Sequence, residues 1–73
     1  MRFKKGEYVF ILTKDDGQWG SEGPFEILSY DPRSGYHCRD ADGRSLLVRS
    51  SDAFNDMGTA IAEVMARNFG GSA

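Results

Sequence analysis

The sequence is short of the residues from which catalytic and metal sites are usually built. Its 73 residues include one cysteine, Cys38, and one histidine, His37. Because these neighbours would lie in a strand, their side chains point to opposite faces and cannot share a metal ion or form a nucleophile–base pair. A lone cysteine also cannot form an internal disulfide, which favours a reducing compartment. We therefore expect a cytoplasmic protein that is not an enzyme and needs neither metal nor cofactor.

Long apolar runs and a strong charge of one sign are also missing. No segment is long enough to span a bilayer, and the basic opening is followed by a strand-like segment without a cleavage-like site. The formal net charge is −2, whereas a dedicated nucleic-acid-binding domain is expected to be strongly basic. A membrane is therefore not expected as a partner, and direct binding of nucleic acid is only the second hypothesis.

Three short apolar runs between residues 23 and 49 predict the centre of the fold. Two turns rich in glycine, proline and aspartate separate them, a pattern typical of a three-stranded antiparallel meander. Before it, the apolar run 8–12 predicts another strand. The polar, glycine-rich stretch 13–23 predicts a long surface loop. We expect Trp19 in this loop to fold back onto the core, with exposure as a contact residue as the alternative.

The two turns set the register of the meander. A four-residue first loop would pair Asp31 with Tyr36. A three-residue second loop, with Gly43 in the left-handed bulge position, would pair Cys38 with Leu46, and only this choice keeps one face apolar. The predicted core face comprises Phe25, Ile27, Tyr36, Cys38, Leu46 and Val48. The opposite face is too apolar to be simply solvated, and it comprises Leu28, Tyr30, His37 and Leu47 beside Arg39.

The end of the chain predicts an amphipathic helix over about residues 55–69. Asn55 or Asp56 can cap it, and Gly70 and Gly71 can stop it. Apolar residues recur at helical spacing, namely Met57, Ala60, Ile61, Val64, Met65 and Phe69. We expect this stripe to pack against the sheet rather than to bind a partner. The chain then forms one domain, residues 1–69, with a barrel over about 3–54 and a flexible tail over 70–73.

The sequence resembles the SH3-like small barrels. The resemblance rests on two segments, 3–9 (FKKGEYV) and 23–28 (GPFEIL), followed by the meander and a short turn after Val48. The similarity is to KOW and Tudor-like domains and to the C-terminal domain of retroviral-type integrases, and it covers about residues 3–54. It implies a mainly β fold, a small barrel of about four or five antiparallel strands, to which a C-terminal helix is added. Such barrels host unrelated functions.

The same resemblance implies a partner. KOW-like barrels are frequent in proteins that bind RNA polymerase or the ribosome. A small barrel with a helix also looks like the phage-encoded proteins that bind bacterial RNA polymerase and regulate transcription. Charge is segregated along the chain, which can steer a partner of mixed charge. We therefore hypothesise a protein-binding transcription regulator, monomeric or weakly homodimeric. Its candidate contact residues are Arg2, Phe3, Lys4, Lys5, Trp19, Tyr30, His37 and Arg39.

Two other readings remain open. In the first, a direct nucleic-acid binder, a tryptophan or tyrosine (Trp19 or Tyr30) stacks on a base while four arginines meet phosphates, namely Arg33, Arg39, Arg44 and Arg49. In the second, aromatic side chains converge into a cage that reads a methylated residue. The available aromatic side chains for such a cage are few, and the predicted register buries Tyr36.

Overall fold

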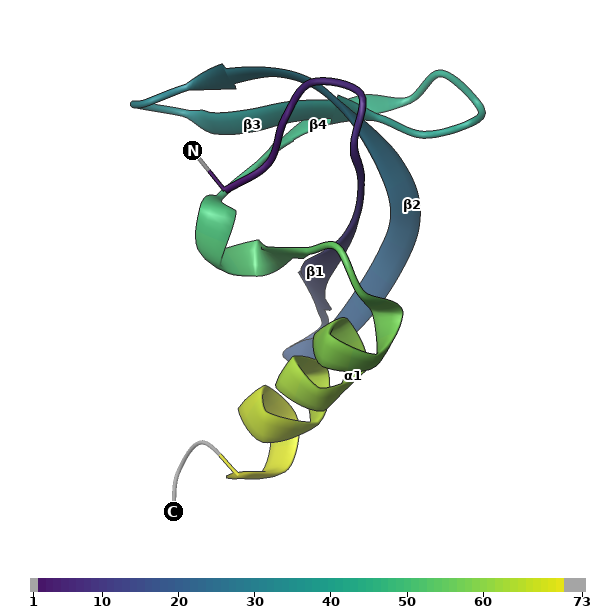
Figure 1. Ribbon diagram of the computed structural model, residues 1–73. Coiled ribbons are helices and arrows are strands. Elements are labelled where there is room, and N and C mark those ends of the chain that lie inside the picture. The colour runs from purple at the N-terminus through teal and green to yellow at the C-terminus, as the bar shows by residue number, and fades with distance from the viewer. Residues whose placement is uncertain (1, 71–73) are drawn as a thin grey trace.

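The computed structural model describes residues 2–70 and shows one antiparallel sheet with a helix at one end (Figure 1). The sheet has the order β4-β3-β2-β1-β5, and its strands are β1 (Tyr8–Asp15), β2 (Gln18–Asp31), β3 (Gly35–Arg39), β4 (Ser45–Val48) and β5 (Ala53–Phe54). A 3₁₀ turn, η1 (Ser50–Asp52), precedes β5, and α1 (Met57–Met65) continues into a π-helical segment, η2 (Ala66–Gly70). The predicted class, mainly β with one C-terminal helix, is confirmed. Within residues 2–70 the sheet is not closed into a barrel, because β4 and β5 form its two edges.

The long strand β2 organises the sheet. Its first part pairs with β1 and its last part pairs with β3, and in Figure 1 it curves from the helix to the meander. Apolar side chains on one side of this curve form the core, which comprises Phe3, Val9, Ile11, Phe25, Ile27, Tyr36, Cys38, Val48 and Ala53. The predicted core face of the meander is therefore buried, apart from Leu46, which is half-buried.

The predicted long loop over residues 13–23 is wrong, because these residues extend the β1–β2 hairpin. A two-residue turn, Asp16-Gly17, joins the strands, and both residues have positive φ, at 55° and 81°. This is the backbone of a type I′ turn, which an Asp-Gly pair favours and which matches the twist of the strands. Lys14 therefore pairs with Trp19 across the hairpin.

The register of the second hairpin is confirmed. Cys38 pairs with Leu46 and Tyr36 with Val48. Gly43 has a φ of 88°, and the backbone N–H of Asp40 donates to the carbonyl of Arg44 at 2.9 Å. The three-residue loop with a left-handed glycine therefore forms as the turn chemistry predicts.

The register of the first hairpin is wrong by one residue near its turn. Asp31 pairs with Gly35, and Tyr30 pairs with Tyr36. A bulge in β2, at residue 28, shifts the pairing by one more residue, so that Ile27 pairs with Cys38 and not with Asp40 as the predicted register would have it. A shift of two residues keeps every side chain on its face, so the predicted core face is still correct. Because paired residues share a face, Tyr30 lies beside Tyr36 and not on the face of His37.

The helix is capped as predicted, but its apolar stripe is only partly covered. The carboxylate of Asp56 accepts the backbone N–H of Thr59 at 2.8 Å. α1 packs mainly against β1, β2 and β5, where Ala60 is buried and Val64 is half-buried. The expectation that the whole stripe packs against the sheet is therefore wrong for its other members. Residues 71–73 of the predicted tail lie outside the described residues, and within residues 2–70 no helix is long and apolar enough to cross a membrane.

Candidate protein-docking surface

The exposed side of the helix carries a row of large apolar side chains, which we call the helix ridge: Met57, Ile61, Met65 and Phe69. Their exposed fractions are 53%, 46%, 56% and 78%. A spacing of four residues places the first three on one side of α1, and Phe69 follows at the same spacing in η2. The sheet covers the neighbouring row of Ala60 and Val64 instead, so the ridge is left facing outward.

A groove of about 320 Å³ separates the helix ridge from the β1–β2 hairpin. Met57, Ile61 and Val64 line it on the helix side, and Phe10 and residues 21–23 line it on the hairpin side. Glu22 is the one charged residue in this lining. The ridge and groove together form an apolar surface with a single acidic group at its border.

The chain segments that carry this surface are rich in acidic residues. We define the helical end as residues 13–22 together with residues 50–70. It holds two basic residues, Lys14 and Arg67, and six acidic ones, Asp15, Asp16, Glu22, Asp52, Asp56 and Glu63. The net charge of these residues is thus −4, although the whole chain carries only −2. It is −3 when Arg44, the ion-pair partner of Glu22, is counted with them. A partner that brings basic side chains to the border of the ridge is favoured by this field.

Arg67 fastens the end of the helix to the rest of the molecule. Its Nη1 donates to Oδ1 of Asp52 at 2.8 Å, its Nε donates to Oε2 of Glu63 at 3.0 Å, and its Nη2 donates to the carbonyl of Ser51 at 3.1 Å. The hydrogen bond with the Asp52 carboxylate is the main cause that raises the pKa of Arg67 above its ordinary value. The guanidinium therefore joins η2, α1 and η1, and the helix is held with its ridge outward.

Trp19 lies under the same end of the helix. The guanidinium carbon of Arg67 lies 4.5 Å from the centre of its ring, and Nζ of Lys14 lies 5.6 Å from it. The Trp19 backbone N–H donates to Oδ1 of Asn68 at 3.0 Å, and Nδ2 of Asn68 donates back to the Trp19 carbonyl at 3.1 Å. The half-buried indole therefore packs against the end of the helix and joins it to the hairpin. The expectation that it folds back onto the core is wrong, because Trp19 is neither in the core nor among the residues packed against it.

The predicted contact residues at the N-terminus divide between core and surface. Phe3 is 1% exposed and belongs to the core, so its side chain is not a surface contact. The backbone N–H of Arg2 donates to the hydroxyl of Tyr36 at 2.7 Å. The Arg2 guanidinium donates to the carbonyl of Ser50, and its carbon lies 4.8 Å from the centre of the Phe3 ring. Lys4 and Lys5 are exposed.

The remaining predicted contacts lie on the meander and are not gathered into one site. His37 pairs with Leu47, which is 60% exposed, on the sheet face that the helix leaves uncovered. Arg39 forms an ion pair with Glu26 at 3.5 Å. Tyr30 lies on the other face, where its ring packs 4.7 Å from that of Tyr36. The eight predicted residues are therefore not gathered into one site: seven lie at several separate places on the surface, and Phe3 is in the core.

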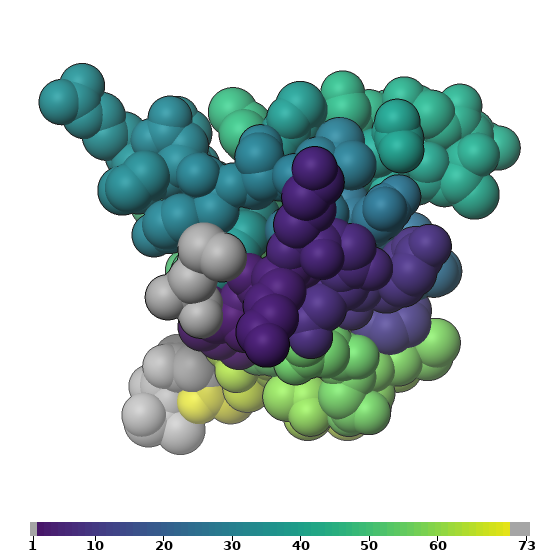
Figure 2. Space-filling model, turned by 45° about the horizontal axis from the view of Figure 1, so that its top comes forward, coloured from purple at the N-terminus to yellow at the C-terminus, as the bar shows by residue number. Residues whose placement is uncertain are grey.

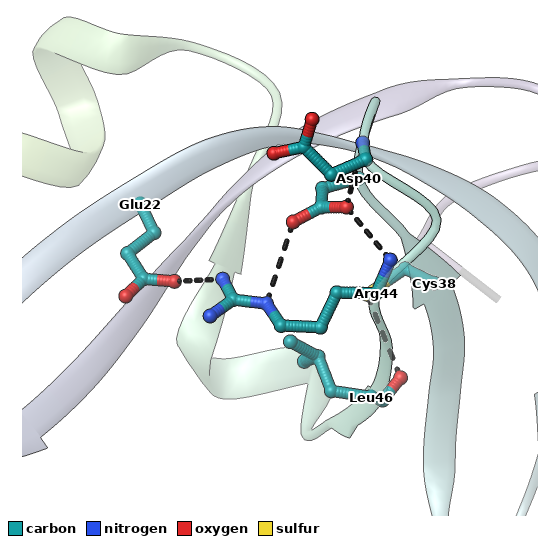
Figure 3. A network of polar contacts seen from close by, with 6 residues as sticks. Glu22, Cys38, Asp40, Arg44 and Leu46 are labelled. Atoms are coloured by element: carbon teal, nitrogen blue, oxygen red, sulfur yellow. Dashed lines mark hydrogen bonds and ion pairs between the residues drawn. The ribbon is translucent and has the colours of Figure 1, made fainter.

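A network around Arg44 holds the β3–β4 loop against β2 (Figure 3). Nη2 of Arg44 lies 2.7 Å from Oε2 of Glu22, and its Nε lies 3.3 Å from Oδ2 of Asp40. The other oxygen of Asp40 accepts the backbone N–H groups of Arg44 and Asp42, at 2.9 and 3.0 Å. Beside this network, burial raises the pKa of the Cys38 thiol. Arg44 is therefore already neutralised by two carboxylates.

In comparisons with protein-family models, with curated proteins and with solved structures, the chain has no significant match. The resemblance to SH3-like barrels thus stays a prediction from the sequence. Within residues 2–70, no three histidine, cysteine, aspartate or glutamate side chains group as metal ligands would. The helix ridge is the most distinctive surface of the described residues, and its members were assigned to the core by sequence. The sequence carried no signal for this exposure, because six apolar residues in a helix of about 15 residues is the ordinary density of a stripe that faces the core.

Proposed function

We propose that this chain is a non-catalytic protein-binding regulator that docks through the helix ridge on a large nucleic-acid machine. The observation that carries the proposal is the ridge itself, an exposed row of large apolar side chains on a helix held in place by Arg67. Large exposed apolar patches on small proteins mark interaction sites. The resemblance to KOW-like barrels and to small phage regulators makes bacterial RNA polymerase the first partner to test.

The size of the ridge fits a protein partner. A fully exposed large side chain presents about 200 Å², so the exposed fractions of the four ridge residues leave roughly 450 Å² of mostly apolar surface. A standard interface buries about 800 Å² on each partner. The ridge alone therefore supplies about half of that area.

The charge of the helical end favours a different protein over a second copy of this chain. A symmetric dimer through the ridge would bring two ends of net charge −4 together. Like charges facing each other across an interface oppose binding. The expected occupant is therefore a partner surface or segment with apolar side chains and basic residues beside them.

Binding to purified RNA polymerase tests this proposal. The substitution Met65→Glu places a charge in the middle of the ridge, and Leu47→Glu places the same charge on an equally exposed apolar residue of the uncovered sheet face. We expect Met65→Glu to weaken binding at least about tenfold, the size of effect that a central interface residue gives. We expect Leu47→Glu to bind like the wild type.

Three results would contradict the proposal. If the wild type does not bind polymerase at low or moderate salt, the assignment of this partner is wrong. If Leu47→Glu is the damaging substitution, the docking surface is the sheet face. If sedimentation shows a dimer of the free protein that Met65→Glu converts to a monomer, the ridge serves a second copy.

A further inference from the structure

A second pocket lies on the meander, away from the helix. It is formed by the β2–β3 turn, the chain just after β4 and the start of η1, and has a volume of about 270 Å³. In Figure 2 the β2–β3 turn, in dark teal, projects from the body of the molecule. The lining residues that matter for its chemistry are Tyr30, Arg33 and Arg49.

The two arginines of this pocket differ from the other two of the meander. Arg39 is paired with Glu26, and Arg44 is paired with two carboxylates. Within residues 2–70, neither Arg33 nor Arg49 forms an ion pair. The carboxylate of Asp31, on the same turn, accepts the backbone N–H of Arg33 at 2.8 Å. Two guanidinium groups are therefore left to bind an anion at one place.

Tyr30 gives the pocket an aromatic surface, and its ring packs against that of Tyr36. Its ring centre lies 4.7 Å from that of Tyr36, with the planes tilted by 45°. Tyr36 is itself buried, and its hydroxyl accepts the backbone N–H groups of Arg2 at 2.7 Å and Phe3 at 3.1 Å. Tyr30 nevertheless remains 40% exposed. An exposed aromatic ring held in place by its neighbour is suited to base stacking.

We propose that this pocket binds single-stranded nucleic acid, with one base stacked on Tyr30 and neighbouring phosphates bound by Arg33 and Arg49. The pocket volume is slightly below the range of about 300–1,000 Å³ typical of drug-sized ligands and suits one nucleotide of a longer strand. Outside the helical end the chain carries a net charge of +2, since the whole is −2 and that end is −4. The site is separate from the helix ridge, so this inference stands or falls independently of the proposed protein docking.

Fluorescence anisotropy with a labelled oligothymidine of about ten nucleotides, titrated at several salt concentrations, tests the inference. Two phosphate contacts on a single strand give a log–log salt slope of about −1.4. Arg33→Gln and Arg49→Gln should each flatten this slope by about 0.7 and weaken binding at low salt. Tyr30→Ala should weaken binding about tenfold, within the range for loss of one stacked base, without changing the slope, whereas Tyr30→Phe should retain most of the affinity.

Arg39→Gln is the matched control, because it removes the same charge from a neighbouring strand but from an existing ion pair. We expect it to leave the affinity within about twofold of the wild type, since the charge of Arg39 is already compensated by Glu26. Equal weakening by Arg39→Gln and Arg33→Gln would mean that only overall charge matters and would overturn the site. Equal affinity for an abasic oligonucleotide would overturn the stacking, and failure of the oligothymidine to bind at the lowest salt would overturn the whole inference.

Discussion

The substitution Arg67→Ala tests how the helix is held. In the structure, one guanidinium contacts two carboxylates, one carbonyl and the ring of Trp19. Alanine keeps a good helix former at this position but removes all four contacts. The carboxylates of Asp52 and Glu63 would then face each other's negative charge without a cation between them. We therefore expect the C-terminal end of the helix to loosen from η1, with the two hydrogen bonds between Asn68 and Trp19 left to hold it to the hairpin.

The loss of stability follows from these contacts. Each partly exposed ion pair contributes at most about 1 kcal/mol, and the guanidinium–indole contact about 0.5–1 kcal/mol. Together they predict a loss of about 2–3 kcal/mol on Arg67→Ala. A domain of 73 residues has a total stability of roughly 4–11 kcal/mol, so the variant should remain folded with a melting temperature lowered by about 10–20 °C. Arg67→Lys keeps the positive charge but not the planar guanidinium that donates to several acceptors at once. It should therefore lower the free energy of unfolding by about half as much as Arg67→Ala.

Urea unfolding followed by tryptophan fluorescence measures this directly, because the one tryptophan, Trp19, lies under Arg67. The native emission of Arg67→Ala should also shift to the red as the indole becomes wetter. Arg39→Ala, which breaks the exposed pair with Glu26, is the control and should cost at most about 1 kcal/mol. If Arg67→Ala lies within about 0.5 kcal/mol of this control, the helix is not held by Arg67 and the reasoning fails.

Three further predictions concern single groups. Hydrogen bonds, first from the Thr59 backbone N–H, lower the pKa of Asp56 in the folded protein. Its carboxylate should therefore stabilise the fold fully above about pH 4, and this stabilisation should be lost as the pH falls through the lowered pKa. In Asp56→Ala, the free energy of unfolding should change less with pH over this range. Burial raises the pKa of Cys38, so its thiol should resist a disulfide reagent at mildly alkaline pH until urea is added; rapid labelling of the folded protein would refute its burial. Gly35 has a φ of 103° and its added Cβ would collide with the Val48 carbonyl, so Gly35→Ala should cost at least about 2 kcal/mol in the same unfolding assay, unlike Gly20→Ala, where the space is open.

The parts of the fold that depend on local turn chemistry were the most predictable from sequence. The second hairpin followed from Gly43, because a left-handed residue at that position admits only one register that keeps the core face apolar. The first hairpin was misjudged by one residue at its turn and, beyond the bulge at residue 28, by two. The total shift is even, so the alternation of the core residues stays intact. The β1–β2 hairpin was missed although Asp16-Gly17 is a strong turn signal. Its polar strands extend beyond the core, so their composition is that of a loop.

The candidate site was less predictable, because tertiary packing chooses which row of a helix is buried. Ala60 and Val64 face the sheet, while the larger Met57, Ile61 and Met65 are displaced to solvent. Periodicity alone treats these residues as one stripe. In the same way, the sequence showed four arginines on the meander. Only the structure separates Arg39 and Arg44, which form ion pairs, from Arg33 and Arg49, which form none within residues 2–70.

Hydroxyl-radical footprinting of the complex with RNA polymerase tests the central claim most directly. In the free protein, Met57, Met65 and Phe69 are exposed, and so are Tyr8 and Leu47 on other surfaces. We predict that the partner protects the three ridge residues from oxidation and leaves Tyr8 and Leu47 as reactive as before. Protection of Leu47 with undiminished oxidation of Met65 would show that the protein docks through its sheet and would contradict the account.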